Sequence, residues 1–441
     1  MKALKLAVAA SLLWGFVGAA ADADPVQATL RFRIGGGNLA THEAGDPSTQ
    51  MYQALEGVGA KLGRMNSYGW RNLARAPTPQ DFEAAMLEAY RHGITPMILF
   101  EYEGSYQFLS PPQPIGSRSD WSRIGATYAR RFQPNGTWGR EHGITDWGVT
   151  IFSAINEPDV QATIPRPAYH DALAGLAEGV HSVAPGLKVI PGGFATCNSH
   201  SDETLRGYGT AIADLLQDGH LDGIDLHTYY NARWFPLTKG HYFSAQSCFD
   251  RVKRTLKITR DIGFYATEFN IARDDAWSDP AVAASLFLTA LWDELGVVGR
   301  DGHTPVTQLA FPWNLGDISA EPPYAMALGE KPWQPDRRAE VLRRVLKLAG
   351  DMTFVTLDPN LTGTFVLSGP GGELHVWQDR PDWTDHPGTT WDVIAPNWAG
   401  EAQLWDWRGK IRDIHVEHGH AIATDLAQDA TYMMLFPTAG R

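Results

Sequence analysis

Two glutamates in this sequence stand in surroundings that suit acid–base or nucleophilic chemistry. Glu157 follows the apolar run 147–155 and lies between the amide of Asn156 and the ring of Pro158. Glu268 lies in a second β-rich run, 264–270, within the motif ATEFN. When two carboxyl groups face each other across a site, one can donate a proton while the other attacks a carbon atom or activates water. Such a pair requires a fold that brings the two segments together.

The pattern of the chain before Gly350 predicts that fold. Short β-rich runs alternate with amphipathic helical stretches, and one helix is bounded by Thr78-Pro79 and Gly93, which match common start and stop signals. Eight strands, each followed by a helix, predict a (β/α)8 TIM barrel. The expected strands are 29–35, 61–67, 95–102, 147–155, 187–194, 222–229, 264–270 and 308–315. The segment IGGGN at 34–38 is interpreted only as a turn signal, because it lacks the pattern of a phosphate-binding loop.

A TIM barrel carries its chemistry at the C-terminal ends of its strands. Glu157 ends the fourth expected strand and Glu268 lies near the end of the seventh, so we predict that they approach one another across the barrel mouth. Other polar or aromatic side chains are expected at the same rim. They are Asn38, Arg64, Asn66, Glu101, Glu103, Asn156, Asn198, His227, Tyr229, Asn270, Trp313 and Asn314.

Four of these strand-end motifs resemble a known enzyme class. INEP after the fourth strand, HTY after the sixth, ATEFN at the seventh and FPWN at the eighth resemble the retaining (β/α)8 glycoside hydrolases of clan A, most like family 39. The resemblance covers the mature chain in architecture but only a handful of positions in motif. It implies cleavage of β-D-glycosidic, or stereochemically equivalent, bonds of a poly- or oligosaccharide by double displacement. Glu157 would be the acid/base and Glu268 the nucleophile.

The resemblance also implies roles for five further residues. Asn156 would bind the sugar 2-hydroxyl, Tyr229 and Arg64 would orient the nucleophile, His227 would line the same subsite, and Trp313 would form an aromatic floor under the sugar. Repulsion from a neighbouring carboxylate would keep Glu157 protonated in the free enzyme, and esterification of Glu268 would remove that repulsion. The expected partner is a carbohydrate, with no metal or organic cofactor.

The chain beyond the barrel has a different rhythm. After residues 24–350, which hold the predicted barrel, the segment 351–441 alternates strands and turns without helices. This pattern predicts a small antiparallel β-sandwich. Its tryptophans suit the core of the sandwich or a domain interface better than a sugar-binding surface. They are Trp377, Trp383, Trp391, Trp398, Trp405 and Trp407.

The N-terminus and the composition indicate an exported globular protein. Lys2 and Lys5 precede an apolar run, and Ala21-Asp22-Ala23 offers a cleavage site, so residues 1–23 are predicted to be a signal peptide. No later stretch is apolar and long enough to span a bilayer, and the expected location is secreted or periplasmic. The net charge of −13, without a block of like charges, argues against a nucleic acid partner.

The two cysteines, Cys197 and Cys248, form a candidate disulfide in an oxidising compartment. That bond would stabilise the fold by about 4 kcal/mol on the chain-entropy estimate. The alternative is a pair of unrelated thiols. Neither cysteine has the spacing of a zinc ligand set.

Other functions remain open at this point. A catalytically silent carbohydrate-binding barrel would keep the aromatic residues but lose the chemistry, and the retained pair Glu157 and Glu268 disfavours it. A metal-dependent hydrolase needs clustered ligands, and a Schiff-base aldolase needs a lysine at a strand end; neither pattern is found. Within the glycosidase class, exo-action on xylosides or arabinosides competes with endo-action, including processing of an exopolysaccharide.

Overall fold

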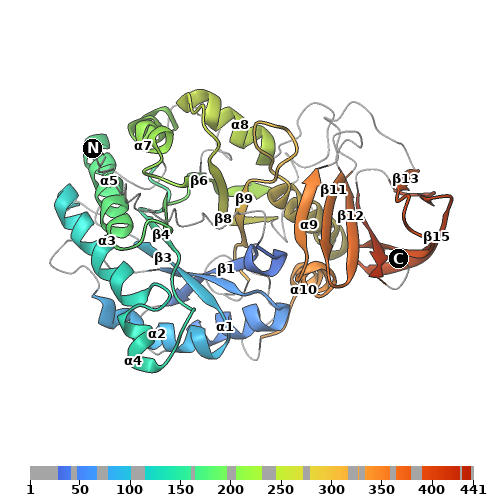
Figure 1. Cartoon of the computed structure of the whole chain (residues 1–441), viewed down its shortest axis with the longest axis horizontal. Helices are drawn as coiled ribbons and strands as arrows, with labels where there is room; N and C mark the ends of the chain where they lie inside the picture. The colour runs from blue at the N-terminus through green and yellow to red at the C-terminus, as the bar shows by residue number, and fades with distance from the viewer. Residues whose placement is uncertain are drawn as a thin grey trace, which may run out of the picture.

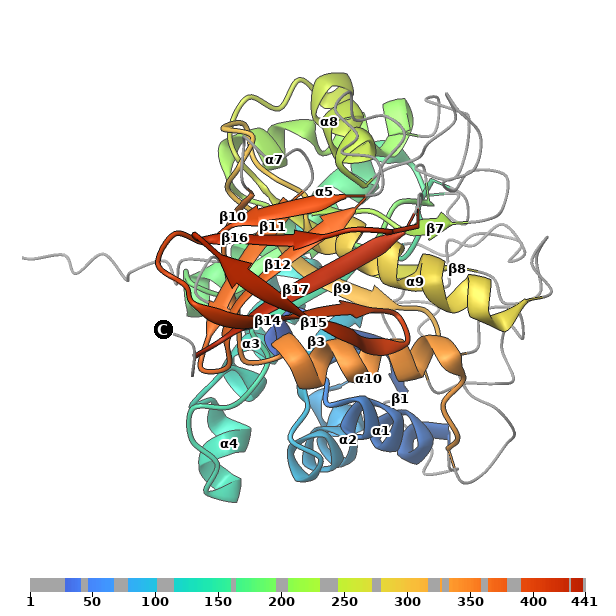
Figure 2. The same cartoon turned by 90° about the vertical axis from the view of Figure 1, so that its right-hand side faces the viewer.

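A computed structural model of the chain describes most of the sequence after the predicted signal peptide (Figures 1 and 2). The described residues are 28–40, 47–66, 78–100, 115–159, 164–195, 205–230, 245–271, 279–315, 326, 333–357, 364–378, 390–427 and 430–438. The predicted signal peptide, 1–23, lies outside these ranges. No helix in the described ranges has the length and apolar character needed to cross a membrane.

Parallel strands form a closed barrel. The strands β1 (Gly35–Ala40), β2 (Leu62–Asn66), β3 (Thr95–Phe100), β4 (Ile151–Ala154) and β5 (Lys188–Pro191) pair in sequence order. In a second parallel sheet, β8 (Gly263–Ile271) pairs with β6 (Gly223–Asp225), β7 (Thr228–Tyr230) and β9 (Thr307–Pro312). Two isolated parallel bridges, Ile34 to Ala310 and Phe194 to Leu226, join the edges of the two sheets. Since β6 and β7 are two parts of the predicted sixth strand, the predicted eight-stranded barrel is confirmed.

Helices follow the strands and cover the outside of the barrel (Figure 1). They are α1 (Pro47–Val58), α2 (Pro79–Arg91), α3 (Arg118–Phe132), α4 (Thr137–His142), α5 (Arg166–Val183), the π-helical turn η6 (Leu205–Gly209), α7 (Ala213–Asp218), α8 (Ala245–Leu256), α9 (Pro280–Leu295) and α10 (Arg337–Ala349). The predicted start of α2 is confirmed: Thr78 donates its backbone N–H to Asp81 Oδ2 at 2.6 Å, and Pro79 takes the first helical position.

The first strand differs from the prediction. Instead of a strand at 29–35, the chain forms a short 3₁₀ turn, η2 (Leu30–Phe32), and β1 then runs through the glycines at 35–37. The interpretation of IGGGN as a turn is therefore wrong. A Cβ atom at Gly35 would overlap Leu62 O and the Phe311 ring. Glycine is needed here because neighbouring strands approach so closely that no side chain fits.

Apolar side chains fill the barrel interior beneath its mouth. One cluster draws residues from β2, β3, β5, β8 and β9, whose alternating inward positions meet on the barrel axis. Its buried members are Leu62, Met97, Ile190, Tyr265, Leu309 and Phe311. The polar residues at the strand ends therefore stand on a packed floor.

The C-terminal strands form the predicted β-sandwich. They are β10 (Thr353–Leu357), β11 (Thr364–Gly369), β12 (Gly372–Gln378), β13 (Trp391–Ile394), β14 (Gly400–Asp406), β15 (Gly409–Glu417), β16 (His420–Ala423) and β17 (Thr431–Pro437). All eight join one antiparallel path in the order β10-β11-β12-β17-β14-β15-β16-β13. Its core includes Trp377, Trp391 and Trp398, as predicted, and Trp377 and Trp391 stack at 5.8 Å between ring centroids. Trp405 and Trp407 are partly buried, and Trp383 lies outside the described residues.

The sandwich packs against α9 and α10 at one end of the molecule (Figures 1 and 2). Two hydrogen bonds join the sandwich to α9: Gln378 Nε2 donates to Thr289 O at 2.8 Å, and Thr431 Oγ1 lies 2.7 Å from Thr289 Oγ1. The largest hydrophobic cluster continues from the barrel into the sandwich through Phe354 and Phe365. The division into domains at 350 and 351 stays a prediction.

Only one of the two cysteines lies in the described part of the chain. Cys248, in α8, is buried and disulfide-bonded. Cys197 lies outside the described residues, so the specific pair stays a prediction.

Close packing of α3 on α5 gives a test of the fold. A Cβ atom at Gly179 would overlap Ser122 O, whereas one at Gly186 meets nothing within 4 Å. We expect Gly179→Ala to lower the free energy of unfolding by about 1–3 kcal/mol, as overpacking does, although alanine favours an isolated helix. Chemical denaturation measures this. Gly186→Ala is the matched control and should change stability by less than about 0.5 kcal/mol; equal effects of the two variants would contradict the described packing.

Candidate active site

Glu157 reaches the barrel mouth through a sharp turn after β4. Ile155 and Glu157 both have positive φ, 65° and 40°, which few non-glycine residues adopt. The Glu157 N–H donates to Gly193 O at 2.9 Å and ties this turn to the segment after β5. A Cβ atom at Gly193 would overlap the His227 ring. Glycine at this position therefore lets His227 come close to the Glu157 turn.

Glu268 lies inside β8 and is held at both carboxylate oxygens. Arg64, in the middle of β2, donates to Oε1 at 2.6 Å, and the Tyr229 hydroxyl donates to Oε2 at 2.6 Å. Burial, with 5% of the residue exposed, would raise the pKa of Glu268. The charges of His227 and Arg64 and the two hydrogen bonds outweigh burial and lower the pKa below its usual 4.5. Glu268 is therefore ionised at neutral pH.

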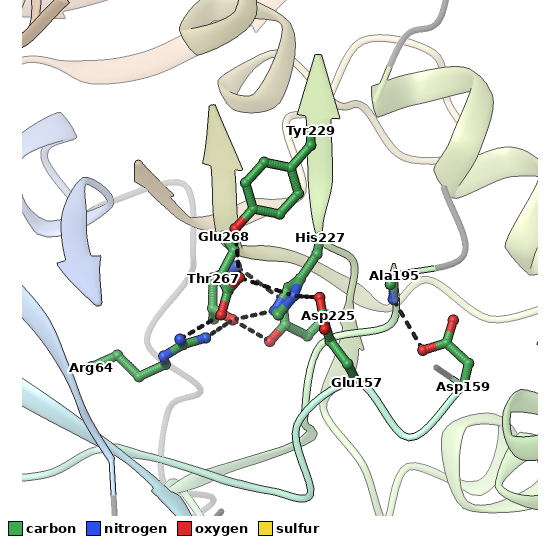
Figure 3. A network of polar contacts seen from close by, with 9 residues as sticks. All are labelled: Arg64, Glu157, Asp159, Ala195, Asp225, His227, Tyr229, Thr267 and Glu268. Atoms are coloured by element: carbon green, nitrogen blue, oxygen red, sulfur yellow. Dashed lines mark hydrogen bonds and ion pairs between the residues drawn. The ribbon is translucent and has the colours of Figure 1, made fainter. Parts of the chain in front are cut away.

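His227 stands between the two glutamates (Figure 3). Its Nδ1 atom lies 2.8 Å from Glu157 Oε1 and 3.4 Å from Glu268 Oε2, and the residue is fully buried. Burial would lower its pKa, but the charges of Glu268, Glu157 and Asp225 and the hydrogen bond to Glu157 raise it to about 9. The imidazolium form therefore persists at neutral pH.

The two carboxyl groups meet, as the sequence predicts. One oxygen of Glu157, one oxygen of Glu268 and a ring nitrogen of His227 all lie within 4.8 Å of one another. Three groups with potential ligand atoms at this distance could also hold a metal ion. Both oxygens of Glu268 already accept hydrogen bonds, from Arg64 and from Tyr229, and the charge of Arg64 beside them disfavours a second cation. These residues fit an ion-pair network better than a metal site.

Two other predicted rim residues, Trp313 and Asn156, lie beside these groups. The Arg64 guanidinium lies 5.4 Å from the Trp313 ring centroid, which places this half-buried ring beside the hydrogen-bond partner of Glu268. Asn156 is buried, and its Oδ1 atom has no hydrogen-bond partner among the described residues. Asn66 and Asn314 are also buried.

Other rim predictions have different outcomes. Asn270 is structural: its amide donates to Trp313 O, and its Oδ1 accepts from Arg338 at 3.3 Å. Asn38 lies in β1. Glu101, Glu103 and Asn198 lie outside the described residues.

Two residues that sequence reasoning missed complete the network. Asp225, at the end of β6, is buried and accepts both the N–H and the hydroxyl of Thr267, at 2.9 and 2.6 Å. The Thr267 hydroxyl also contacts Arg64 and His227. Thr267 precedes Glu268 and Asp225 lies two residues before His227, so their positions beside predicted site residues were the available signal.

Comparison with known proteins extends this description. No protein-family model and no curated protein matches the sequence. A family 39 glycoside hydrolase from Bacteroides cellulosilyticus WH2 is similar in structure, with 15% identity, 92% of this chain and 81% of that chain covered, and a TM-score of 0.55. A glucosidase from Croceicoccus marinus matches with 13% identity, 92% and 96% coverage and a TM-score of 0.57.

A third similar structure is a family 51 α-L-arabinofuranosidase from Bifidobacterium longum, with 14% identity, 94% and 98% coverage and a TM-score of 0.55. The chain has the fold of these glycoside hydrolases. The predicted resemblance, including the likeness to family 39, is thus confirmed at the level of the fold.

The buried imidazolium predicts a pH-dependent stability. The His227 pKa rises from 6.5 to about 9 on folding, so its charged form stabilises the fold fully below pH 6.5, and this contribution is lost as pH rises through about 9. We expect the free energy of unfolding to fall by up to about 3 kcal/mol across that window. In His227→Asn this slope should disappear, as measured by urea denaturation at a series of pH values. His415→Asn, at an exposed position of the sandwich, should keep the wild-type slope; an unchanged slope in His227→Asn would refute the assignment.

Proposed function

We propose that this protein is a retaining glycoside hydrolase that cleaves β-D-glycosidic, or stereochemically equivalent, bonds of a poly- or oligosaccharide. The observation that carries the proposal is the meeting of Glu157 and Glu268 oxygens within 4.8 Å at the mouth of a barrel. Retaining enzymes hold their carboxyl groups about 5–5.5 Å apart, whereas inverting enzymes leave about 6.5–9.5 Å for a water molecule. The short separation supports double displacement. The predicted signal peptide at 1–23 makes export part of the proposal.

In the first step, Glu268 is the nucleophile and Glu157 is the acid. A Glu268 oxygen forms an ester bond to the anomeric carbon while the bond from that carbon to the leaving oxygen breaks, and Glu157 gives its proton to the leaving oxygen. The lowered pKa of Glu268 supports this role because only the ionised carboxylate attacks. Tyr229 and Arg64 hold its two oxygens in fixed directions.

In the second step, water replaces the enzyme on the sugar. Glu157, now ionised, takes a proton from water, the water oxygen bonds to the anomeric carbon, and the ester bond breaks to release the Glu268 carboxylate. Because Nδ1 of His227 lies within 2.8 Å of Glu157, a hydrogen bond can stabilise the ionised base during this step.

The sugar contacts are proposed from the same geometry. Asn156 directly precedes Glu157 in the turn at the barrel mouth, and its amide would contact the sugar 2-hydroxyl. Trp313 offers an aromatic face for the apolar side of the sugar ring, and His227 lines the same subsite. The similar structures include a glucosidase and an arabinofuranosidase by name, which supports a carbohydrate substrate for this chain.

Replacing each glutamate separates the two roles. On an activated aryl glycoside, Glu268→Gly should lower kcat by roughly 10⁴- to 10⁶-fold, the scale expected when a nucleophile is removed. Glu157→Ala should lose far less on this substrate, since an activated leaving group needs little protonation, and added azide should accelerate its second step. Proton NMR of the first product of the wild-type enzyme should show retained anomeric configuration.

These measurements also distinguish the main alternatives. Full activity of Glu268→Gly would exclude Glu268 as nucleophile, and an inverted product would exclude double displacement. Binding of sugars without turnover, across a panel of polysaccharides and aryl glycosides, would instead indicate a catalytically silent carbohydrate-binding barrel.

The acid limb of the pH–rate profile tests the environment of Glu268. Because the pKa of Glu268 is lowered from 4.5, we expect the fall of kcat/KM at acid pH to have its midpoint below pH 4.5. Tyr229→Phe removes one hydrogen bond to the ionised form, so the limb should move to higher pH by about one unit. Tyr432→Phe, which removes a hydroxyl from the sandwich core, should leave the limb in place. An unmoved limb in Tyr229→Phe would contradict the assigned interaction.

A further inference from the structure

A further carboxylate lies behind the active site and contacts it through a hydroxyl group. Asp225 accepts the Thr267 hydroxyl at Oδ2, 2.6 Å away, and the Thr267 N–H at Oδ1, 2.9 Å away. On its other side, the Thr267 hydroxyl lies 3.3 Å from His227 Nε2 and 3.1 Å from Arg64. Figure 3 shows this chain from Asp225 through Thr267 to the imidazole. Asp225 and Thr267 are both buried, so water does not compete for these bonds.

When Asp225 is ionised, the protons in this series of hydrogen bonds can be arranged in only one way. A threonine hydroxyl has one proton to donate and two lone pairs to accept with. Its proton goes to the carboxylate, which can only accept, so both lone pairs face donors. Arg64 is one donor. His227 Nε2 must therefore be the other, and it carries a proton.

We propose that Asp225 is a positioning residue that, through the Thr267 hydroxyl, keeps Nε2 of His227 protonated. The second proton of the imidazolium then lies on Nδ1, where it faces Glu157 and Glu268. The catalytic part of this inference rests on the proposed function. The arrangement of protons does not, because it concerns the resting protein.

The consequence for the reaction is an exchange of hydrogen-bond partners. Nδ1 lies 2.8 Å from Glu157 and 3.4 Å from Glu268, so one N–H group can serve either carboxylate. It stabilises Glu268 while that residue is the free nucleophile. Once Glu268 is esterified and Glu157 is ionised, the same N–H stabilises Glu157. A neutral imidazole with a bare Nδ1 could do neither.

The charges around His227 fit this role. Three carboxylates face it: Glu157 from the turn after β4, Asp225 from β6 and Glu268 from β8. The cation Arg64, from β2, contacts the same Thr267 hydroxyl. Asp225 is the one carboxylate of the three that reacts with nothing in the proposed mechanism, and its charge helps to raise the His227 pKa. Burial in turn raises the pKa of Asp225, against the lowering effects of His227, Thr267 and Arg64.

Asp225→Asn tests the inference because it reverses the direction of donation along these hydrogen bonds. The amide oxygen of the substituted side chain would still accept the Thr267 N–H, so its NH₂ group would face the hydroxyl and donate to it. Thr267 would then turn its own proton towards Nε2, which must be bare to accept it. Ring ¹⁵N NMR, with the signal assigned by its loss in His227→Asn, should show two protonated nitrogens at pH 7 in the wild type and a bare Nε2 in Asp225→Asn.

Kinetics provide the second measurement. In Asp225→Asn we expect kcat to fall by about 10- to 100-fold, part of the 10²–10⁴ that acid–base catalysis commonly supplies. KM should change by less than about threefold because Asp225 does not touch the substrate. The basic limb of the pH–rate profile should also move to lower pH, because the imidazolium loses the negative charge of Asp225.

Matched variants make the test specific. Asp222→Asn alters a carboxylate just before the opposite end of the same strand, where it accepts from Val189 N–H, and should leave the His227 spectrum unchanged. If Asp225→Asn does not fold, Thr267→Ser and Thr267→Val replace it: serine keeps the hydroxyl and should resemble the wild type, whereas valine should lose the Nε2 proton.

Three results would overturn the inference. They are a bare Nε2 in the wild type, a wild-type spectrum in Asp225→Asn or Thr267→Val, and equal effects of Asp222→Asn and Asp225→Asn. An active Glu268→Gly variant would refute the proposed function instead, and the NMR result would still decide the arrangement of protons.

Discussion

Two carboxyl groups within 4.8 Å in a largely buried site repel each other unless positive charge lies beside them. Here the charge comes from His227, between the two glutamates, and from Arg64, on the far side of Glu268. The hydroxyl of Tyr229 adds a neutral donor to the same carboxylate. Thr267 and Asp225 help to hold these charged groups in place, since the Thr267 hydroxyl contacts Arg64 and His227 and donates to Asp225.

The barrel makes such a balance possible because its strands converge at one mouth. The charged groups come from β2, the turn after β4, and the segments from β6 to β8, and their side chains meet in the same space. Close approach of these segments requires residues without side chains at some positions. At Gly37, an added Cβ would overlap the Trp313 ring, and at Gly193 it would overlap His227. The glycines are therefore as much a part of the site geometry as the charged residues.

A network of this kind links stability to reactivity. The bonds that lower the Glu268 pKa and raise that of His227 also stabilise the folded chain, because a pKa shift on folding is a difference in free energy between two states. Substitutions at the site will therefore change both properties. For this reason the informative measurements are those that report on one group alone. They include the pH dependence of the free energy of unfolding, one limb of the pH–rate profile and the protonation of one ring nitrogen.

The order of strands and helices was predictable from the sequence, because the buried strands are continuous apolar runs and α2 has strong capping signals. The glutamate pair could be predicted as well, since a barrel fixes where strand ends lie. The first strand could not, because β1 consists partly of glycines whose presence is explained by β2 and β9 rather than by local propensity. The split of the sixth strand into β6 and β7 likewise follows from pairing with β8.

The sequence by itself therefore determined the architecture and the identity of the two carboxylates, because periodicity and chain order carry that information. Only the tertiary structure decided which groups balance their charges. Neither Asp225 nor Thr267 stands out in the sequence, because their contact depends on the parallel register of β6 and β8. The protonation of His227 depends in turn on side chains from several strands, and distances of this kind exist only after the barrel has closed.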